Sequence, residues 1–245
     1  MQSTHQTKPQ QGWMLLTKYP PKFRHFEGVI LIHHEEAYKV IKEIYDDGDE
    51  SSEVLWRLMR AILEVVARLD YSKKEKKRLL LTAKIYAVKA YEQDPKHFES
   101  VKYAALVSGQ LREYLGIRAA YEENKLYLKL LNEALFLREE VTLWHLSGRW
   151  FFDAAMMSTK KRLALRLLLK KPPRLGVWAS IPMFTSAYRM NPKFVENTAY
   201  LGLALFYNNE KGEANQYLRE ALHIPLWVLD RVNLQAEVRA AYRRT

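Results

Sequence analysis

The 245-residue sequence predicts an all-α protein built from repeated helical hairpins. Apolar residues recur three or four positions apart through long segments, without the sustained alternation that strands show. Only nine glycines and nine prolines interrupt these segments, so long helices joined by short turns are expected. Two of the segments also end alike, because Ala90 and Ala187 each stand five residues before a proline.

These similar endings indicate an internal repeat. The segment with Ala83, Ala87, Ala90 and Pro95 matches the segment with Ser180, Phe184, Ala187 and Pro192. A period of about 34 residues carries the pattern on to Leu201-Gly202 and then to Ala214, Leu218 and Ala221. Small residues at these positions let paired helices approach closely, as in the tetratricopeptide pattern. The sequence therefore predicts an all-α, tetratricopeptide-like solenoid of about four helical hairpins.

The expected helices follow in order along the chain. Trp56 and the Trp144, Gly148, Phe151 set mark the first helices of two hairpins, and Ser72 with Glu75 has capping-box spacing. We expect a leading helix over Glu35–Tyr45, hairpins over Val54–Leu69 with Lys73–Gln93, Phe98–Tyr114 with Ala119–Leu137, Val141–Met157 with Val177–Met190, and Val195–Tyr207 with Glu213–His223, and a C-terminal capping helix over Leu226–Tyr242. Residues 1–33 are expected to form a basic, loosely ordered arm. Residues 34–245 are expected to form a single domain with an insertion at about 158–176.

Composition restricts the function classes. Lysine and arginine number 39 against 28 acids, and the net charge of +11 favours an anionic partner. The absence of cysteine excludes disulfides and thiol catalysis and fits a reducing compartment, so a cytoplasmic location is expected. The longest apolar run, Ala199 to Tyr207, has nine residues, so no transmembrane segment is expected.

No motif points to catalysis. The cluster His33-His34-Glu35-Glu36 places its members on different faces of a helix, unlike a metal site. No phosphate-binding glycine loop and no nucleophile elbow is present. We therefore expect a protein that is not an enzyme and that holds no cofactor and no metal.

The positive charge gathers in two clusters. The first basic cluster lies in the opening turns of the helix that starts at residue 73 and consists of Lys73, Lys74, Lys76, Lys77 and Arg78. The macrodipole disfavours cations at a helix start, so stability alone does not explain them. They form either a solvated face or a binding site for an anionic ligand, of which an acidic protein surface is one candidate.

The second basic cluster lies in the insertion and consists of Lys160, Lys161, Arg162, Arg166 and Lys170. On a helical wheel Arg162, Arg166 and Lys170 form one stripe, and the leucines between them fill a wide apolar arc. We expect this arc to be buried against the array. A basic amphipathic helix on a membrane surface is the alternative.

A third set of candidates lies on the first helices of the hairpins, which line the concave face of such arrays. These groove residues are Arg57, Arg60, Lys102, His145 and Arg149. The tryptophans beside them, Trp56 and Trp144, are expected to pack between helices. Arg57, Lys102 and Arg149 are the better ligand candidates of the set, although snorkelling arginines are the alternative.

Several segments together are similar to one family. The segments Glu53-Val54-Leu55-Trp56-Arg57-Leu58-Met59-Arg60-Ala61, Tyr114-Leu115-Gly116-Ile117-Arg118, His145-Leu146-Ser147-Gly148-Arg149-Trp150 and Lys171-Pro172-Pro173 resemble, in order and approximate spacing, those of the regulator of microtubule dynamics family. The resemblance covers about residues 35–221. It implies a cytoplasmic protein that associates with microtubules and spindle poles and influences chromosome segregation. Some members are instead anchored to membranes at organelle contacts, where the repeat domain is linked to phospholipid binding.

From charge and resemblance together we expect a non-enzymatic protein that binds microtubules through the acidic tails of tubulin. Other mitotic proteins and anionic phospholipid are further candidate partners. Phospholipid binding or transfer and a peptide-binding scaffold are the alternative functions. Nucleic acid is not expected as a partner, because the aromatic residues occupy packing positions and form no stacking platform.

Overall fold

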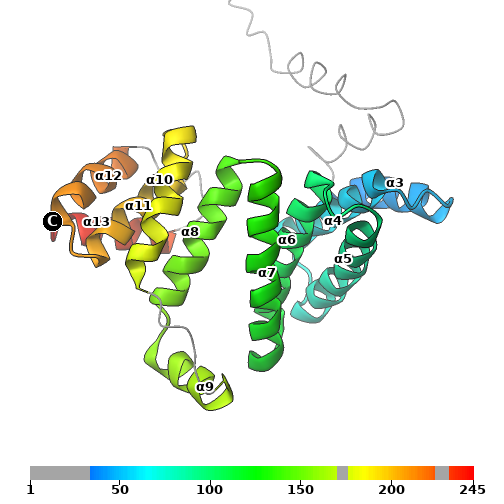
Figure 1. Cartoon of the computed structure of the whole chain (residues 1–245), viewed down its shortest axis with the longest axis horizontal. Coiled ribbons are helices and arrows are strands. Elements are labelled where there is room, and N and C mark those ends of the chain that lie inside the picture. Colours follow the sequence, from blue (N-terminus) through cyan, green and yellow to red (C-terminus); the bar gives the residue numbers. More distant parts are fainter. Residues whose placement is uncertain (1–33, 170–175, 224–231) are drawn as a thin grey trace, which may run out of the picture. The chain divides into compact units, whose positions relative to one another are not determined.

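The computed structural model describes residues 34–169, 176–223 and 232–245, and within them every regular element is a helix (Figure 1). The elements are α3 (His34–Asp46), α4 (Ser52–Arg68), α5 (Lys73–Gln93), α6 (Phe98–Leu111), η1 (Arg112–Tyr114), α7 (Ile117–Leu137), α8 (Val141–Ala155), α9 (Thr159–Leu169), η2 (Val177–Ser180), α10 (Ile181–Met190), α11 (Val195–Tyr207), α12 (Lys211–His223) and α13 (Val232–Tyr242). The predicted all-α fold of helical hairpins is confirmed.

Two predicted helices begin or end in a tighter 3₁₀ turn. The helix predicted over 98–114 is α6 followed by η1, and the helix predicted over 177–190 is η2 followed by α10. Pro182 stands in the first turn of α10. Because proline has no N–H to donate, a helix tolerates it in the first turn and not in its interior. The change from the 3₁₀ turn of η2 to the α-helix α10 therefore falls beside Pro182.

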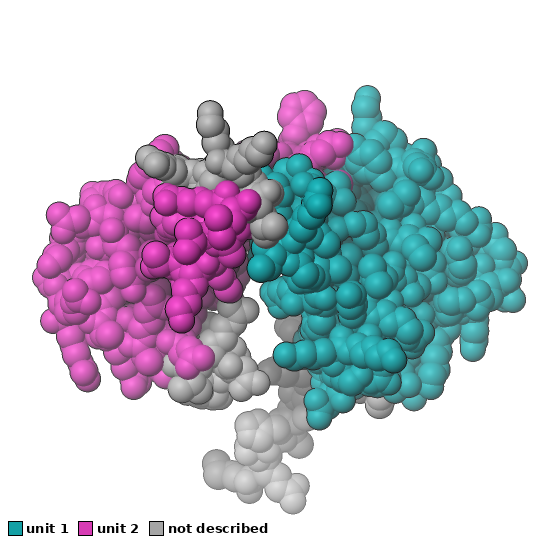
Figure 2. Space-filling view, turned by 90° about the horizontal axis from the view of Figure 1, so that it is seen from below, with its two compact units in different colours: residues 1–127 teal, residues 128–245 magenta. Residues whose placement is uncertain are grey.

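The chain divides into two compact units, which Figure 2 colours separately. Unit 1 comprises residues 1–127 and unit 2 comprises residues 128–245, with the boundary inside α7. Each unit has its own buried core. The predicted arm of residues 1–33 and the start of the predicted capping helix lie outside the described residues.

In unit 1 the core forms around α4. Eleven of its residues are buried, and they lie on all of its faces because α3, α5 and α6 pack around it. Against it α5 places a row of small residues, Ala83, Ala87 and Ala90, which lets the two helices approach closely. The other face of α5 is left to the solvent.

The start of α5 is fixed by the predicted capping box. The backbone N–H of Glu75 donates to Ser72 Oγ at 3.2 Å, and the backbone N–H of Ser72 donates to Glu75 Oε2 at 3.0 Å. The hydrogen bonds from Ser72 also lower the pKa of the Glu75 carboxyl below its ordinary value, so it is charged at neutral pH. Both groups satisfy amides that the first turn of a helix leaves without an internal partner.

Replacing Ser72 with alanine should therefore lower the free energy of unfolding by about 1 kcal/mol. Ser51, at the start of α4, is the matched control, since its side chain makes no capping hydrogen bond. Chemical denaturation of both variants measures the difference. An equal loss for Ser51→Ala and Ser72→Ala would contradict the importance of the capping box.

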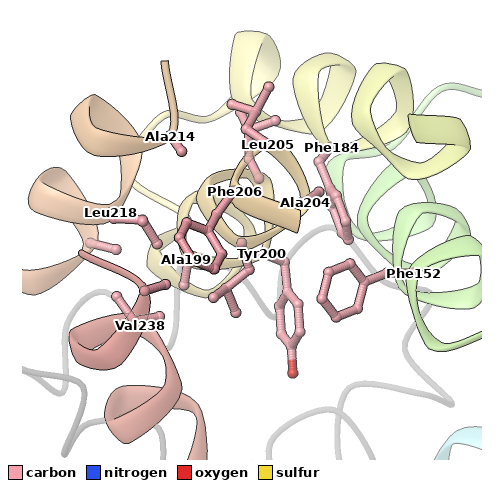
Figure 3. Packing of buried hydrophobic residues seen from close by; sticks show 14 of the residues in the cluster. Phe152, Phe184, Ala199, Tyr200, Ala204, Leu205, Phe206, Ala214, Leu218 and Val238 are labelled. Carbon is pink, nitrogen blue, oxygen red and sulfur yellow. The ribbon is translucent and has the colours of Figure 1, made fainter. Parts of the chain in front are cut away.

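In unit 2 the core is a cluster of aromatic and aliphatic residues from α8, α10, α11, α12 and α13. Figure 3 shows Phe152 and Phe184 at one end of it and Leu218 and Val238 at the other. Phe184 is fully buried beneath Gly148, where an added Cβ would lie 2.6 Å from the phenyl ring. The small residue that the repeat pattern predicts at position 148 is thus required by the close approach of α8 and α10.

The insertion forms a helix, α9, but one prediction about it is wrong. Leu163 and Leu167, which the helical wheel assigns to a buried arc, are 58% and 79% exposed. Arg162 instead folds back, and its Nη2 donates to the carbonyl oxygen of Ala155 at 2.9 Å. The amphipathic pattern identified the apolar face of the helix, but it did not show that the described residues leave Leu163 and Leu167 exposed.

Candidate partner-binding surfaces

The first basic cluster occupies the first two turns of α5. Lys73, Lys74 and Arg78 are exposed, and Lys76 and Lys77 are half-buried. None of the four lysines forms an ion pair with any described residue, and the nearest acid, Glu75, is engaged by Ser72. The positive end of the helix dipole adds to their charge. The result is a strongly positive patch that its own unit does not neutralise.

The second basic cluster is only partly available. Lys160 and Lys161 are exposed on α9, and Arg166 lies on the same helix, beside the exposed Leu163 and Leu167. Arg162 is occupied, because it donates to two carbonyl oxygens at the end of α8, those of Ala155 and Met157. The predicted stripe of three cations is therefore interrupted at its first member. Lys170 lies outside the described residues.

Among the groove residues of unit 1, Arg57 lies in the core, with 1% of its surface exposed. Its Nη1 forms an ion pair with Glu53 and also donates to the Glu53 carbonyl oxygen at 2.8 Å. Its guanidinium lies over the Trp56 ring, 4.1 Å from the centroid, and Trp56 stacks on Tyr103. These contacts hold Arg57 and Trp56 as packing residues.

Glu53 links Arg57 to a third group, since His97 Nε2 lies 3.2 Å from its other carboxylate oxygen. Partial burial works to raise the pKa of the Glu53 carboxyl. The hydrogen bonds and charge from Arg57 outweigh burial, so the pKa is lower than the ordinary value. Glu53 is therefore ionised and offsets the charge of Arg57.

Lys102, on α6, lies close to this group. Its Nζ is 3.7 Å from Glu99 and lies near the rings of Phe98 and Tyr103, at 5.6 and 5.5 Å. Arg60, one turn after Arg57, is half-buried. Unit 1 thus brings Arg57 and Lys102 to the stacked pair of Trp56 and Tyr103, but it pairs both cations with its own acids.

In unit 2, His145 and Arg149 meet at Glu196. His145 is buried, with Nδ1 3.1 Å from Asn197 Oδ1 and Nε2 3.7 Å from Glu196 Oε1. Arg149 Nη1 donates to Glu196 at 3.3 Å, and its guanidinium lies over the Tyr200 ring at 3.8 Å. This network connects α8 to α11, the first helices of successive hairpins.

The two networks have the same composition: an arginine, a glutamate and a histidine that join successive hairpins. Sequence reasoning found the arginines and missed the acids. The four-residue spacing of Glu53 and Arg57 was a usable signal. Glu196 lies 47 residues from Arg149, and only the fold brings them together. The acids change the candidate site, because the predicted site cations that remain at the surface are those of the first basic cluster and, on α9, Lys160, Lys161 and Arg166.

The described residues contain neither a metal-ligand cluster nor a membrane-spanning helix. In 34–169, 176–223 and 232–245, no three histidine, aspartate or glutamate side chains gather as metal ligands would. No described helix is long and apolar enough to cross a bilayer. The exposed lysine and arginine side chains of the two basic clusters can bind anionic groups.

Comparisons with known proteins connect the chain to one family. The family model described as "Regulator of microtubule dynamics protein 1-3" matches residues 27–244. Regulator of microtubule dynamics protein 1 of Caenorhabditis elegans is 25% identical over 76% of this chain and 81% of its own length. The protein of the same name from Pongo abelii is 27% identical over 83% of this chain, and protein 3 of Xenopus laevis is 25% identical over 75% of it. The matches span 65% and 39% of these two vertebrate relatives.

Solved structures of helical repeat proteins have the same fold. A thermophilic TPR protein from Thermus thermophilus has a TM-score of 0.55 at 14% identity, covering 95% of this chain and 97% of its own. MamA from Desulfovibrio magneticus has a TM-score of 0.53 at 14% identity, over 83% of this chain and 95% of its own. At this level of identity the likeness shows the tetratricopeptide-like fold alone.

Proposed function

Because the chain belongs to the regulator of microtubule dynamics family, we propose that it binds microtubules without catalysing a reaction. The first basic cluster, on α5, meets the acidic tails of tubulin. The observation that carries this assignment is the set of four lysines at the start of α5 that have no acidic partner among the described residues. An acidic tail supplies the carboxylates that the unit itself does not provide.

The groove residues have a structural role in this proposal. Arg57 and Arg149 neutralise Glu53 and Glu196 within the hairpin array, so they hold the array that carries the basic clusters. Each unit thus presents its own basic cluster on a preformed helical surface. Through this binding the protein regulates microtubule dynamics at the spindle and spindle poles in the cytoplasm, and thereby chromosome segregation.

Binding should depend strongly on salt. Exposed ion pairs contribute about 0.2–1 kcal/mol each, and salt reduces the screening length from about 10 Å at 0.1 M to about 3 Å at 1 M. Cosedimentation with microtubules should show at least about tenfold weaker binding as salt rises across this range. An affinity that is independent of salt would contradict a contact made by charge.

The exposed leucines of α9 favour a second candidate function, docking on an anionic membrane surface. Leu163 and Leu167 are one helical turn apart and lie beside Lys160, Lys161 and Arg166. A basic amphipathic helix of this kind inserts its apolar face between lipid headgroups while its cations contact anionic lipid. This surface is separate from the first basic cluster, so the two functions can be tested independently.

Flotation with lipid vesicles tests this second function. The chain should float with vesicles that contain phosphatidylserine and not with pure phosphatidylcholine. Replacing Leu163 and Leu167 together with glutamate should abolish flotation. The control replaces Ile117 and Phe136, which are 54% and 91% exposed on α7, with glutamate. If the unaltered chain does not float, or if both double variants float equally well, α9 has no membrane role.

A further inference from the structure

The outer face of α5 carries a row of exposed apolar residues. Leu81, Ile85 and Val88 are 43%, 66% and 50% exposed, and they lie at spacings of four and three residues. The same spacing continues to Lys74 and Arg78 before them and to Glu92 after them. Side chains at alternating spacings of three and four share one face of a helix, as in the seam of a coiled coil. Soluble proteins rarely leave such a row uncovered.

Contacts on both flanks show that this face is turned away from its own unit. Lys84 forms an ion pair with Glu123 of α7 on one side of the row, and Lys89 forms an ion pair with Glu50 on the other. The opposite face of α5 is the one packed in the core, through Ala83 and Ala90. The row therefore lies on the solvent-facing side of α5, between the Lys84–Glu123 and Lys89–Glu50 ion pairs.

The charged residues of the row have opposite signs at its two ends. The cations Lys74 and Arg78 stand at the N-terminal end of α5 and Glu92 stands at the C-terminal end. Both placements oppose the macrodipole of α5 itself. Neither Lys74 nor Glu92 has an ion-pair partner within the described residues. An antiparallel helix with the same sequence would make both placements favourable. Lys74 of one helix would then lie beside Glu92 and the negative C-terminal end of the other helix, and Glu92 would lie beside Lys74 and its positive N-terminal end.

We propose that a second copy of this chain packs antiparallel on this face of α5 and forms a two-fold symmetric dimer. With Leu81 opposite the partner's Ile85, the same register places Lys74 opposite the partner's Glu92. A parallel arrangement would bring lysine against lysine and glutamate against glutamate, which is repulsive. A two-fold axis makes every contact twice, so three apolar residues supply six to the interface.

Sedimentation of the full chain over a range of micromolar concentrations tests the dimer. The chain should pass from monomer to dimer as its concentration rises. Ile85→Lys should raise the dissociation constant at least about tenfold, because it places a charge in the apolar centre of the interface from both copies. Ile85 is 66% exposed, so the variant should keep its circular dichroism spectrum and unfolding midpoint. Ile117→Lys, at a 54% exposed position on α7, is the matched control and should leave the dimer unchanged.

A charge exchange tests the antiparallel register. Lys74→Glu and Glu92→Lys should each weaken the dimer, and the double variant should restore it, since the pair is then remade with its charges reversed. A chain that is monomeric at every concentration overturns the proposal and assigns the row to a different partner. A dimer that persists in the Ile85→Lys variant also overturns the proposal. If the double variant dimerises no more tightly than the two single variants, the antiparallel register is wrong. Lys74 belongs to the first basic cluster, so Lys74→Glu alters both proposed contacts. Ile85→Lys retains the whole first basic cluster, so it tests the dimer without changing the residues proposed to meet tubulin.

Discussion

Replacing Phe184 with alanine should lower the free energy of unfolding by about 3–5 kcal/mol, the range for deleting a buried phenyl ring. The ring is fully buried, stacks on Tyr200 with 5.9 Å between centroids, and lies 6.4 Å from Phe152 and 5.8 Å from His145. The cavity cannot close easily, because Gly148 above the ring has no side chain to fill it. Urea unfolding followed by circular dichroism measures the loss.

Phe136 provides the control in the same unit. Its side chain is 91% exposed at the end of α7, so Phe136→Ala should change the free energy of unfolding by less than about 0.5 kcal/mol. If the two variants lose the same stability, Phe184 is not the centre of the unit 2 core.

Reversing the first basic cluster should give the largest change in binding. Glutamate at all five of its positions should weaken cosedimentation with microtubules by at least about tenfold, since five ion pairs of about 0.2–1 kcal/mol each contribute about 1–5 kcal/mol and about 1.4 kcal/mol is a factor of ten. None of the five side chains is buried, and acids at a helix start are favoured by the macrodipole. The variant should therefore fold at least as well as the unaltered chain.

A second quintuple variant tests whether binding depends on where the positive charges lie or only on the net charge of the chain. It replaces five exposed cations on other parts of the chain with glutamate, which changes the net charge equally: Lys96, Arg118, Arg189, Lys193 and Lys211. Binding should fall much less for this control than for the cluster variant. Equal losses would mean that the net charge, and not the cluster on α5, attracts the partner.

The sequence predicted the helices well because their ends carry strong local signals. Asp94 and Asn191, each followed by proline, cap α5 and α10, and the Ser72–Glu75 capping box starts α5. Small residues predicted the close helix contacts, as Gly148 against Phe184 shows. These signals depend on neighbours in the sequence or on one repeat, so they can be recognised without coordinates.

The candidate site was less predictable, because its properties depend on distant residues. Arg57 and Lys73 look alike as cations on helices, yet one is buried beside Glu53 and the other is exposed. Arg149 pairs with Asp153 on its own helix, but its second acid, Glu196, comes from another helix pair. The amphipathic pattern of α9 likewise could not show that Leu163 is left exposed by the described residues. In each case the exposure of the side chain depends on tertiary contacts, which a helical wheel does not represent.

The most direct test of the proposed function compares intact microtubules with microtubules stripped of their acidic tails by subtilisin. The unaltered chain should cosediment with intact microtubules and bind the stripped ones at least about tenfold more weakly, because the carboxylates that pair with the first basic cluster are gone. The cluster variant should bind both kinds weakly and equally. Equal binding of the unaltered chain to intact and stripped microtubules would contradict the proposal that this cluster meets the tubulin tails.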